Sequence, residues 1–408
     1  MKKIGLVILG MGVLLIGIFS FNKEENRVLV EEKLNNQNTS LVFMLEDKKG
    51  TYNISENIPS GYSLNTSKSV CSNNTIPTWE DHKLYLNNLN KNGTSCYLYF
   101  DEFVSAKDEI LADKEIKIRS LPLTTSSKVE DLTTGTIYKA QDDWGDTYYF
   151  AGNPSDNWLK FAGFYWRIIR INGDGSIRMI YQGASANTTG TGTQIQTSAF
   201  NSSYNSSEYV GYMYTTNQQH GNTTNSTIKG ILDTWYSNNL KSYADKISTE
   251  AGFCGDREMA SGSSWSSTPS STIYYAGYGR LAQSSGNVNP TFKCSNSSDL
   301  YTTSSSSKGN KALSNPIGLI TADEVTMAGL PWSGSTTSNY LYTNQSYWTM
   351  SPCAATAAVV FFVTSTSFHG YNGVDRTYGV RPVINLASDV TLSGTGTVSD
   401  PYVVEGAE

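Results

Sequence analysis

The sequence predicts an α+β protein: an N-terminal helix, a small β domain, and a larger mixed domain with antiparallel sheet, two helices and long loops. Three observations support this prediction. An uncharged apolar run opens the chain, short β-type runs separated by Gly, Asn and Pro follow it, and strand and helix patterns then share the remaining sequence. The length of 408 residues allows two or three domains, since roughly 100–200 residues per domain is usual.

The first 22 residues predict a membrane anchor. The apolar run from Ile4 to Phe21 holds 18 residues without a charge, near the lower end of the roughly 17–25 needed to span a bilayer. Lys2 and Lys3 favour a cytoplasmic N-terminus, which sends the remaining chain outside. A cleaved signal peptide is the alternative, although "GIFSF" is a poor cleavage site. Both interpretations predict an extracellular protein, and the first predicts a single-pass protein of the cell membrane.

The next segments predict a short helical stalk at 23–39, a small β domain at 40–102 and a helical connector at 103–121. The runs "SLVFML", "KLYLNNL" and "SCYLYFDE" alternate like strands between turn residues. The connector is rich in charged residues that favour helix, and Ser105 is a good N-cap.

The five cysteines fit an oxidising compartment, where disulfides persist. Pairing within each segment of the chain is the economical choice, which predicts one bridge between Cys71 and Cys96 and another between Cys254 and Cys294. Cys353 is left over, either as a reactive thiol or as a small buried hydrophobe. No Cys-x-x-Cys occurs and only three histidines are present, so we expect no zinc site and no cofactor.

The larger domain, 122–408, opens with two β-rich runs around Asn-Gly-Asp-Gly at 172–175, which predicts a hairpin. The apolar spacing of Ser226–Ser248 predicts a helix whose stripe packs in the core. Thr321 followed by Glu324 is a capping-box pattern, so a second, shorter helix should begin there. The remaining C-terminal runs are typical of strands, and the Ser- and Asn-rich stretches between are expected to be exposed loops.

Several classes of function find no support. The net charge of −6 gives no basic field for nucleic acid. No Gly-x-Ser-x-Gly elbow, His-Glu-x-x-His motif or phosphate-binding loop occurs. The sequence alone does not exclude a pair of catalytic carboxylates like that of a glycosidase. The densest acidic cluster consists of Asp142, Asp143 and Asp146, and we expect it on an exposed loop.

The sequence "YWTMSPCAATAAVVFFVTSTSFHGYNGVDRTYGVRPVINL" resembles the C-terminal signature of a large group of uncharacterised bacterial surface proteins, as do "FAGFYWRIIRINGDGSIRMIYQG" and "CYLYFDE". More distantly, its closing pattern is similar to C-type-lectin-like domains, which include formylglycine-generating-enzyme-like domains and the variable proteins of diversity-generating retroelements. In those domains the segment before the final Gly-[Phe/Val]-Arg strand contacts the ligand. The corresponding segment here is Cys353–Tyr378.

This sequence departs from those families in two motifs. Cys353 stands alone where the enzymes use a cysteine pair to hold copper, and neither Glu-Pro-Asn nor Gln-Pro-Asp of calcium-dependent lectins occurs. One feature is in keeping with diversification. Residues 353–378 contain no Lys, Glu, Gln, Met or Trp. These are the five residue types that mutation of Asn codons at their adenines cannot produce.

The segment between the last strands is rich in residues that concentrate binding energy at interfaces. We therefore expect ligand contacts from Phe362, Thr364, Ser367, Phe368, His369, Tyr371, Asn372, Asp375, Arg376 and Tyr378. Glycines and serines around them predict an irregular loop presented on a rigid scaffold. Arg381 and Trp348 are expected to be structural. Arg381 lies in an apolar run and should pair with Asp323 or Glu324, because an unpaired buried charge is costly.

These features favour a membrane-anchored extracellular binding or adhesion protein whose ligand-binding surface, diversified on this hypothesis, faces a glycan or a protein. Two alternatives remain. One is a surface enzyme of the formylglycine-generating or hydrolytic type, and the other is a structural cell-surface protein without a specific ligand. Of these three functions, we predict the binding protein, and therefore no enzymatic activity.

Overall fold

The structure is a computed structural model that describes residues 27–30, 39–47, 49–59, 61–80, 83–90, 93–124, 135–282, 287–330, 337–355, 358–366 and 369–408. The expected membrane helix at 1–22 and most of the expected stalk lie outside these residues. Within the described part of the chain, no helix has the length and apolar character needed to cross a bilayer.

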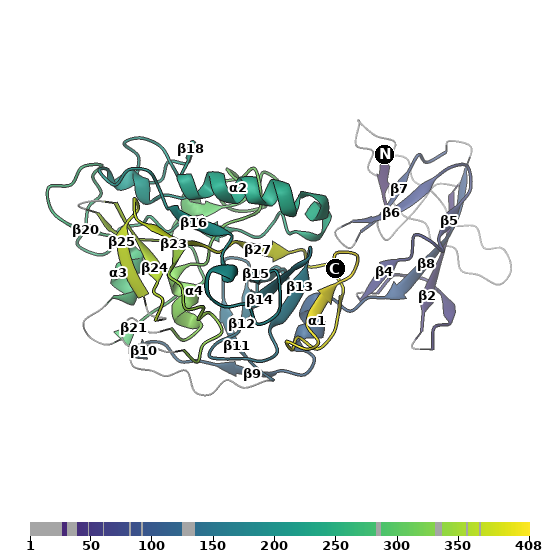
Figure 1. The fold of residues 1–408 in the computed structure, drawn as a ribbon. Coiled ribbons are helices and arrows are strands. Elements are labelled where there is room, and N and C mark those ends of the chain that lie inside the picture. The colour runs from purple at the N-terminus through teal and green to yellow at the C-terminus, as the bar shows by residue number, and fades with distance from the viewer. Residues whose placement is uncertain are drawn as a thin grey trace. The chain divides into compact units, whose positions relative to one another are not determined.

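The chain divides into two compact units, Met1–Ser105 and Ala106–Glu408, called unit 1 and unit 2 below. Both consist mainly of β-strands in several sheets, with few helices (Figure 1).

Unit 1 contains a five-stranded and a three-stranded sheet. Residues buried on alternate positions of its longest strand, β8, form its small core with Leu41, Phe43 and Leu86. The five-stranded sheet consists of β2 (Thr39–Glu46), β3 (Tyr52–Ser55), β4 (Tyr62–Leu64), β5 (Val70–Cys71) and β8 (Thr94–Glu102). The three-stranded sheet consists of β1 (Arg27–Leu29), β6 (Ile76–Glu80) and β7 (Lys83–Asn87).

Strand β1 corrects the expectation for the stalk, because its three residues pair with β7 and so belong to a sheet rather than to a helix. Val28 is fully buried there. The expected disulfide between Cys71 and Cys96 is confirmed, and it joins paired positions of β5 and β8.

The first sheet of unit 2 has nine strands, and the predicted hairpin of β14 and β15 lies in it. Every residue from Trp166 to Ile171 is buried, so this part of the sheet is covered on both faces. The strands are β9 (Glu115–Ile118), β11 (Thr136–Gln141), β12 (Asp146–Tyr149), β13 (Trp158–Phe161), β14 (Phe164–Ile171), β15 (Ile177–Gly183), β27 (Val383–Leu386), β28 (Leu392–Ser393) and β29 (Tyr402–Val404).

The second sheet of unit 2 has six strands and contains the segment expected to bind ligand. Its strands are β16 (Gln196–Ala199), β20 (Ile273–Tyr274), β23 (Tyr347–Ala355), β24 (Ala358–Val363), β25 (His369–Gly373) and β26 (Thr377–Val380). Among the described residues, unit 2 also has three two-stranded pairs: β10 (Leu123–Thr124) with β21 (Asn287–Val288), β17 (Met213–Tyr214) with β18 (Thr224–Asn225), and β19 (Phe253–Cys254) with β22 (Leu300–Tyr301).

Four α-helices occur among the described residues: α1 (Ala106–Leu111), α2 (Thr227–Asn239), α3 (Ala276–Leu281) and α4 (Ala322–Met327). The predicted capping box of α4 is confirmed, with Thr321 and Glu324 each bonded to the other's backbone N–H. Helix α2 has Ser226, the first residue of the predicted helix, as its N-cap, but it gives way to a 3-10 helix at Lys241, before the predicted end at Ser248. Helices α3 and α4 lie beside β23 and β24 (Figure 1).

One helical expectation needs correction, and one helix was missed. The segment 103–121 is not a continuous helix, because α1 ends at Leu111 and β9 then pairs in parallel with β11. Helix α3 was not predicted. Its six residues, "AGYGRL", include two glycines and are too few to show helical periodicity.

Replacing Cys71 and Cys96 with serine is expected to lower the free energy of unfolding of unit 1 by about 3 kcal/mol, as the loss of a bridge closing a loop of this size usually does. Hydrogen–deuterium exchange of β2 and β8 measures the effect. The matched control replaces Cys254 and Cys294, which form the second bridge, and should leave exchange in unit 1 unchanged. Equal protection of β8 with and without its bridge would contradict the prediction.

Candidate functional site

The antiparallel hairpin of β24 and β25 presents Tyr371 to solvent. Tyr371 lies opposite Phe361, and its side chain is 53% exposed. The preceding residue must be small, because a Cβ at Gly370 would lie 2.6 Å from the ring of Phe362. The prediction of an irregular loop is therefore wrong. Most of the described residues between Cys353 and Tyr378 form strands, which hold Tyr371 more rigidly than a loop would.

Tyr371 lies near Tyr278, which comes from another part of unit 2 and has Tyr274 as its own stacking partner. Tyr274 and Tyr278 stack with ring centroids 4.2 Å apart and planes at 25°. Burial raises the pKa of Tyr278, and the nearby phenol groups of Tyr274 and Tyr371 add to that rise. These three residues, called the tyrosine cluster below, are half-buried or exposed. Sequence reasoning missed Tyr274 and Tyr278; their only signal was an aromatic-rich stretch, "IYYAGY", in a segment expected to be loop.

The opposite face of this hairpin is packed. Phe362 is 9% exposed and stacks on Tyr378 with centroids 4.1 Å apart, and Trp348 meets both rings edge-on. Asn372 donates to the Tyr378 hydroxyl at 2.9 Å. Phe362 therefore packs in the core of the sheet rather than facing a ligand, while Asn372 and Tyr378 remain half-buried.

The prediction that His369 contacts a ligand is also wrong, because His369 is a core residue. Its side chain is 2% exposed, and its Nε2 lies 2.8 Å from the Thr326 hydroxyl of α4. Burial lowers the pKa of His369 to about 4. It lies two positions before Tyr371 on the same face of β25. The two differ in exposure because α4 covers the end of the hairpin where His369 lies.

Three further predicted contacts, Asp375, Arg376 and Thr364, lie near the ends of β25 and β24. Asp375 is half-buried and Arg376 exposed in the turn that leads to β26, where the Arg376 N–H donates to the Gly373 carbonyl. Thr364 is half-buried at the other end of the hairpin. The two remaining predicted contacts, Ser367 and Phe368, lie outside the described residues.

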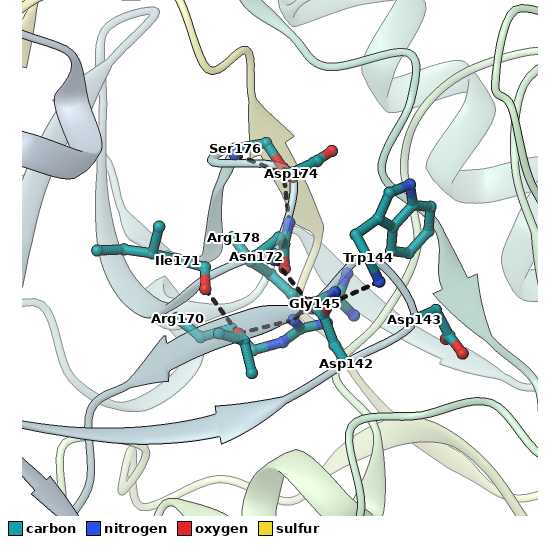
Figure 2. A network of polar contacts seen from close by, with 12 residues as sticks. Asp142, Asp143, Trp144, Gly145, Arg170, Ile171, Asn172, Asp174, Ser176 and Arg178 are labelled. Atoms are coloured by element: carbon teal, nitrogen blue, oxygen red, sulfur yellow. Dashed lines mark hydrogen bonds and ion pairs between the residues drawn. The ribbon is translucent and has the colours of Figure 1, made fainter.

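Unit 2 also contains a buried network of charges that sequence reasoning did not find, and Figure 2 shows the part of it around Asp142, Arg170 and Arg178. Arg170 donates to Asp142 at 2.6 Å and to Glu324 at 3.0 Å, and Arg178 donates to the other oxygen of Glu324 at 3.1 Å. None of these side chains is more than 8% exposed. Burial by itself would raise the pKa of Glu324, but Arg178 and Arg170 outweigh it and hold that pKa below its usual value.

Asp142 corrects the expectation of an exposed acidic loop. It is 3% exposed, and its carboxylate accepts from the backbone N–H groups of Trp144, Gly145 and Gly173. It therefore joins two turns, one between β11 and β12 and the other between β14 and β15 (Figure 2). A Cβ at Gly173 would lie 2.5 Å from the Gly145 nitrogen, so the two turns meet closely only with glycine at that position.

Arg381 is buried as expected, but its expected carboxylate partner is wrong. Its guanidinium donates to the carbonyls of Tyr181 and Leu341 and to the side chain of Gln182, and it lies over the ring of Tyr347. Asp323 and Glu324 pair with other arginines instead. Carbonyl oxygens thus take up the donors of Arg381, while burial lowers the pKa of the group.

Both predicted disulfides are present, and Cys353 is the one cysteine outside them. Burial raises the pKa of the Cys353 thiol far above its usual value. Since the thiolate is the reactive form, this position favours an inert thiol over a nucleophile.

No protein-family model, curated protein or solved structure matches the chain. Within the described ranges, no group of three or more His, Cys, Asp and Glu side chains is arranged to hold a metal ion.

Replacing Glu324 with Gln is expected to lower the free energy of unfolding of unit 2 by about 3–5 kcal/mol, because it leaves buried arginine charge uncompensated. Urea unfolding followed by tryptophan fluorescence measures the change. Asp146→Asn is the matched control, because Asp146 pairs with Lys139 in an exposed ion pair and such pairs contribute little. Equal stability of the two variants would show that the network does not hold the unit together.

His369 predicts a loss of stability in acid. Its folded pKa, about 4, lies below the unfolded value near 6.5, so the stability that it contributes is complete above about pH 6.5 and is lost as the pH falls toward 4, by about 3 kcal/mol. His369→Phe should remove this dependence, and the Thr326 hydroxyl would still donate to the Ala322 carbonyl.

His220 is the control for that experiment. Its pKa is raised, chiefly by its hydrogen bond with Asp299. Its contribution is therefore complete below the unfolded pKa and lost as the pH rises through the folded one. His220→Gln should leave the acid limb of the wild-type profile in place. An unchanged acid limb in His369→Phe would contradict the assignment.

Proposed function

We propose that the chain is a membrane-anchored extracellular binding protein that presents a ligand-binding surface around Tyr371. Its ligand is a glycan or a protein on a cell surface. The single observation that supports this function most strongly is the exposure of Tyr371 on a paired strand beside the stacked pair of Tyr274 and Tyr278.

The tyrosine cluster has the chemistry of a recognition surface. A tyrosine gives a large contact area at a small entropic cost, and its hydroxyl can bond to polar ligand groups. The strand pairing of Tyr371 and the packing of Phe362 on Tyr378 beneath the hairpin keep the surface rigid. A rigid aromatic surface binds without first losing conformational entropy.

On this proposal, unit 2 is a C-type-lectin-like head and unit 1 a small domain between it and the membrane. Two disulfides are in keeping with an extracellular location. The apolar run Ile4–Phe21 would supply the anchor. The exposed part of the C-terminal segment, and not its packed part, would carry any diversified positions. A neighbouring reverse transcriptase gene with a near-copy of the sequence encoding 347–386 would support diversification, and a genome without either would contradict it.

Residues 23–408, produced without the apolar run, are expected to bind defined members of an array of glycans and cell-surface proteins. Tyr371→Ala should weaken that binding by roughly 10- to 100-fold, as the loss of a central aromatic contact does. Tyr97→Ala is the matched control, since Tyr97 in unit 1 is 54% exposed. Binding that is unchanged in Tyr371→Ala, or an array with no bound ligand, would contradict the proposed function.

A further inference from the structure

The sequence contains three Asn-Gly pairs, at 92–93, 172–173 and 372–373. In such a pair the backbone nitrogen of the glycine can approach the side-chain Cγ of the asparagine closely, because glycine has no side chain to obstruct it. Asn92 lies outside the described residues. The structure gives the other two pairs opposite surroundings: Asn172 is buried beside the nine-stranded sheet, and Asn372 lies on the last strand of the six-stranded sheet.

The pair of Asn172 and Gly173 is held apart. Asn172 is 2% exposed, and its Nδ2 donates to Ser176 Oγ at 2.7 Å and to Asn385 Oδ1 at 2.9 Å. The Gly173 N–H donates to Oδ2 of Asp142, at 2.9 Å, rather than to the Asn172 side chain. Hydrogen bonds to other residues therefore fix both the glycine nitrogen and the asparagine amide.

The pair of Asn372 and Gly373 has the opposite arrangement. The Gly373 N–H donates to Oδ1 of Asn372 itself, at 2.9 Å. Because Oδ1 is bonded directly to Cγ, this contact brings the Gly373 nitrogen close to the carbon of the side-chain amide. Reacting atoms about 3–3.5 Å apart are near enough to attack. Asn372 is only half-buried, so water has access to the pair.

Strand pairing turns the Gly373 nitrogen away from the sheet. Strand β25 stands at one end of the strand order and pairs with β24 alone. The Val374 N–H donates to the Ala358 carbonyl of the β24 side, and the bonds of an antiparallel pair alternate along the strand. The Gly373 N–H therefore points away from β24. The chain also leaves the strand at this residue, in a turn that the Arg376 N–H closes on the Gly373 carbonyl.

We propose that Asn372 is a site of spontaneous deamidation, in which the Gly373 nitrogen attacks Cγ of Asn372. A bond forms between that nitrogen and Cγ, and the bond from Cγ to Nδ2 breaks. The proton of the Gly373 N–H passes through water to the leaving nitrogen, which departs as ammonia. Water then opens the resulting succinimide ring at either carbonyl and gives aspartate or isoaspartate. Water is the only other reactant.

This reaction changes the surface next to Tyr371. Asn372 donates through Nδ2 to the Tyr378 hydroxyl at 2.9 Å. A carboxylate at position 372 cannot donate, so the Tyr378 hydroxyl would have to donate instead. Isoaspartate also routes the backbone through Cβ and lengthens β25 by one carbon. Any effect of this change on ligand binding rests on the proposed function, whereas the deamidation itself does not.

The test stores the full chain folded and, separately, in urea, and follows both asparagines by peptide mapping with mass spectrometry. In urea both should deamidate at similar rates, because the fold no longer distinguishes them. In the folded chain Asn172 should react roughly 100-fold more slowly than in urea, whereas Asn372 should stay within about tenfold of its rate in urea. A folded-state rate at Asn372 that falls as far as the rate at Asn172 would overturn the proposal.

Asn372→Gln is the matched variant, because it keeps the amide but lengthens the side chain by one methylene, so that attack would have to close a larger ring. It should release no ammonia from position 372 and leave the rate at Asn172 unchanged. In the wild-type chain the rate at Asn372 should rise between about pH 6 and pH 9, since the nitrogen attacks only after losing its proton. A rate independent of pH, or loss of ammonia from position 372 of the variant at the wild-type rate, would refute attack by the Gly373 nitrogen.

Discussion

Glu324 accepts hydrogen bonds from Arg170 and Arg178 while all three side chains are removed from water. It also closes the capping box of α4 by accepting from the Thr321 N–H. One carboxylate thus fixes the start of a helix against two adjacent strands of the nine-stranded sheet. Because α4 in turn contacts β23 and β24, the position of the six-stranded sheet depends on the same carboxylate.

That dependence reaches the candidate binding surface through His369. The histidine bonds to Thr326 on α4, and the strand that contains it also contains Tyr371. The hairpin is therefore supported on one face by α4 and on the other by the packing of Phe362, Tyr378 and Trp348. On the same strand, Tyr371 is 53% exposed, whereas His369, which bonds to α4, is 2% exposed.

Local features of the fold were predictable from the sequence, and long-range ones were not. The hairpin around Asn172 and the capping box at Thr321 depend on residues a few positions apart, so their patterns can be seen directly. Arg170 and Glu324 are 154 positions apart, and nothing local marks them as partners. The error over Arg381 has the same origin: its burial could be predicted from its apolar neighbours, but its carbonyl partners could not.

The candidate site shows the same division. The residue type and glycine-rich surroundings of Tyr371 predicted its exposure, whereas the burial of His369 depends on a helix formed elsewhere in the chain. The disulfide of unit 2 has a further consequence. It encloses the exposed serine-rich stretch 261–272, so a protease that cleaves the chain there would leave both fragments covalently joined, and a single cut in this surface stretch would not release either part of the unit.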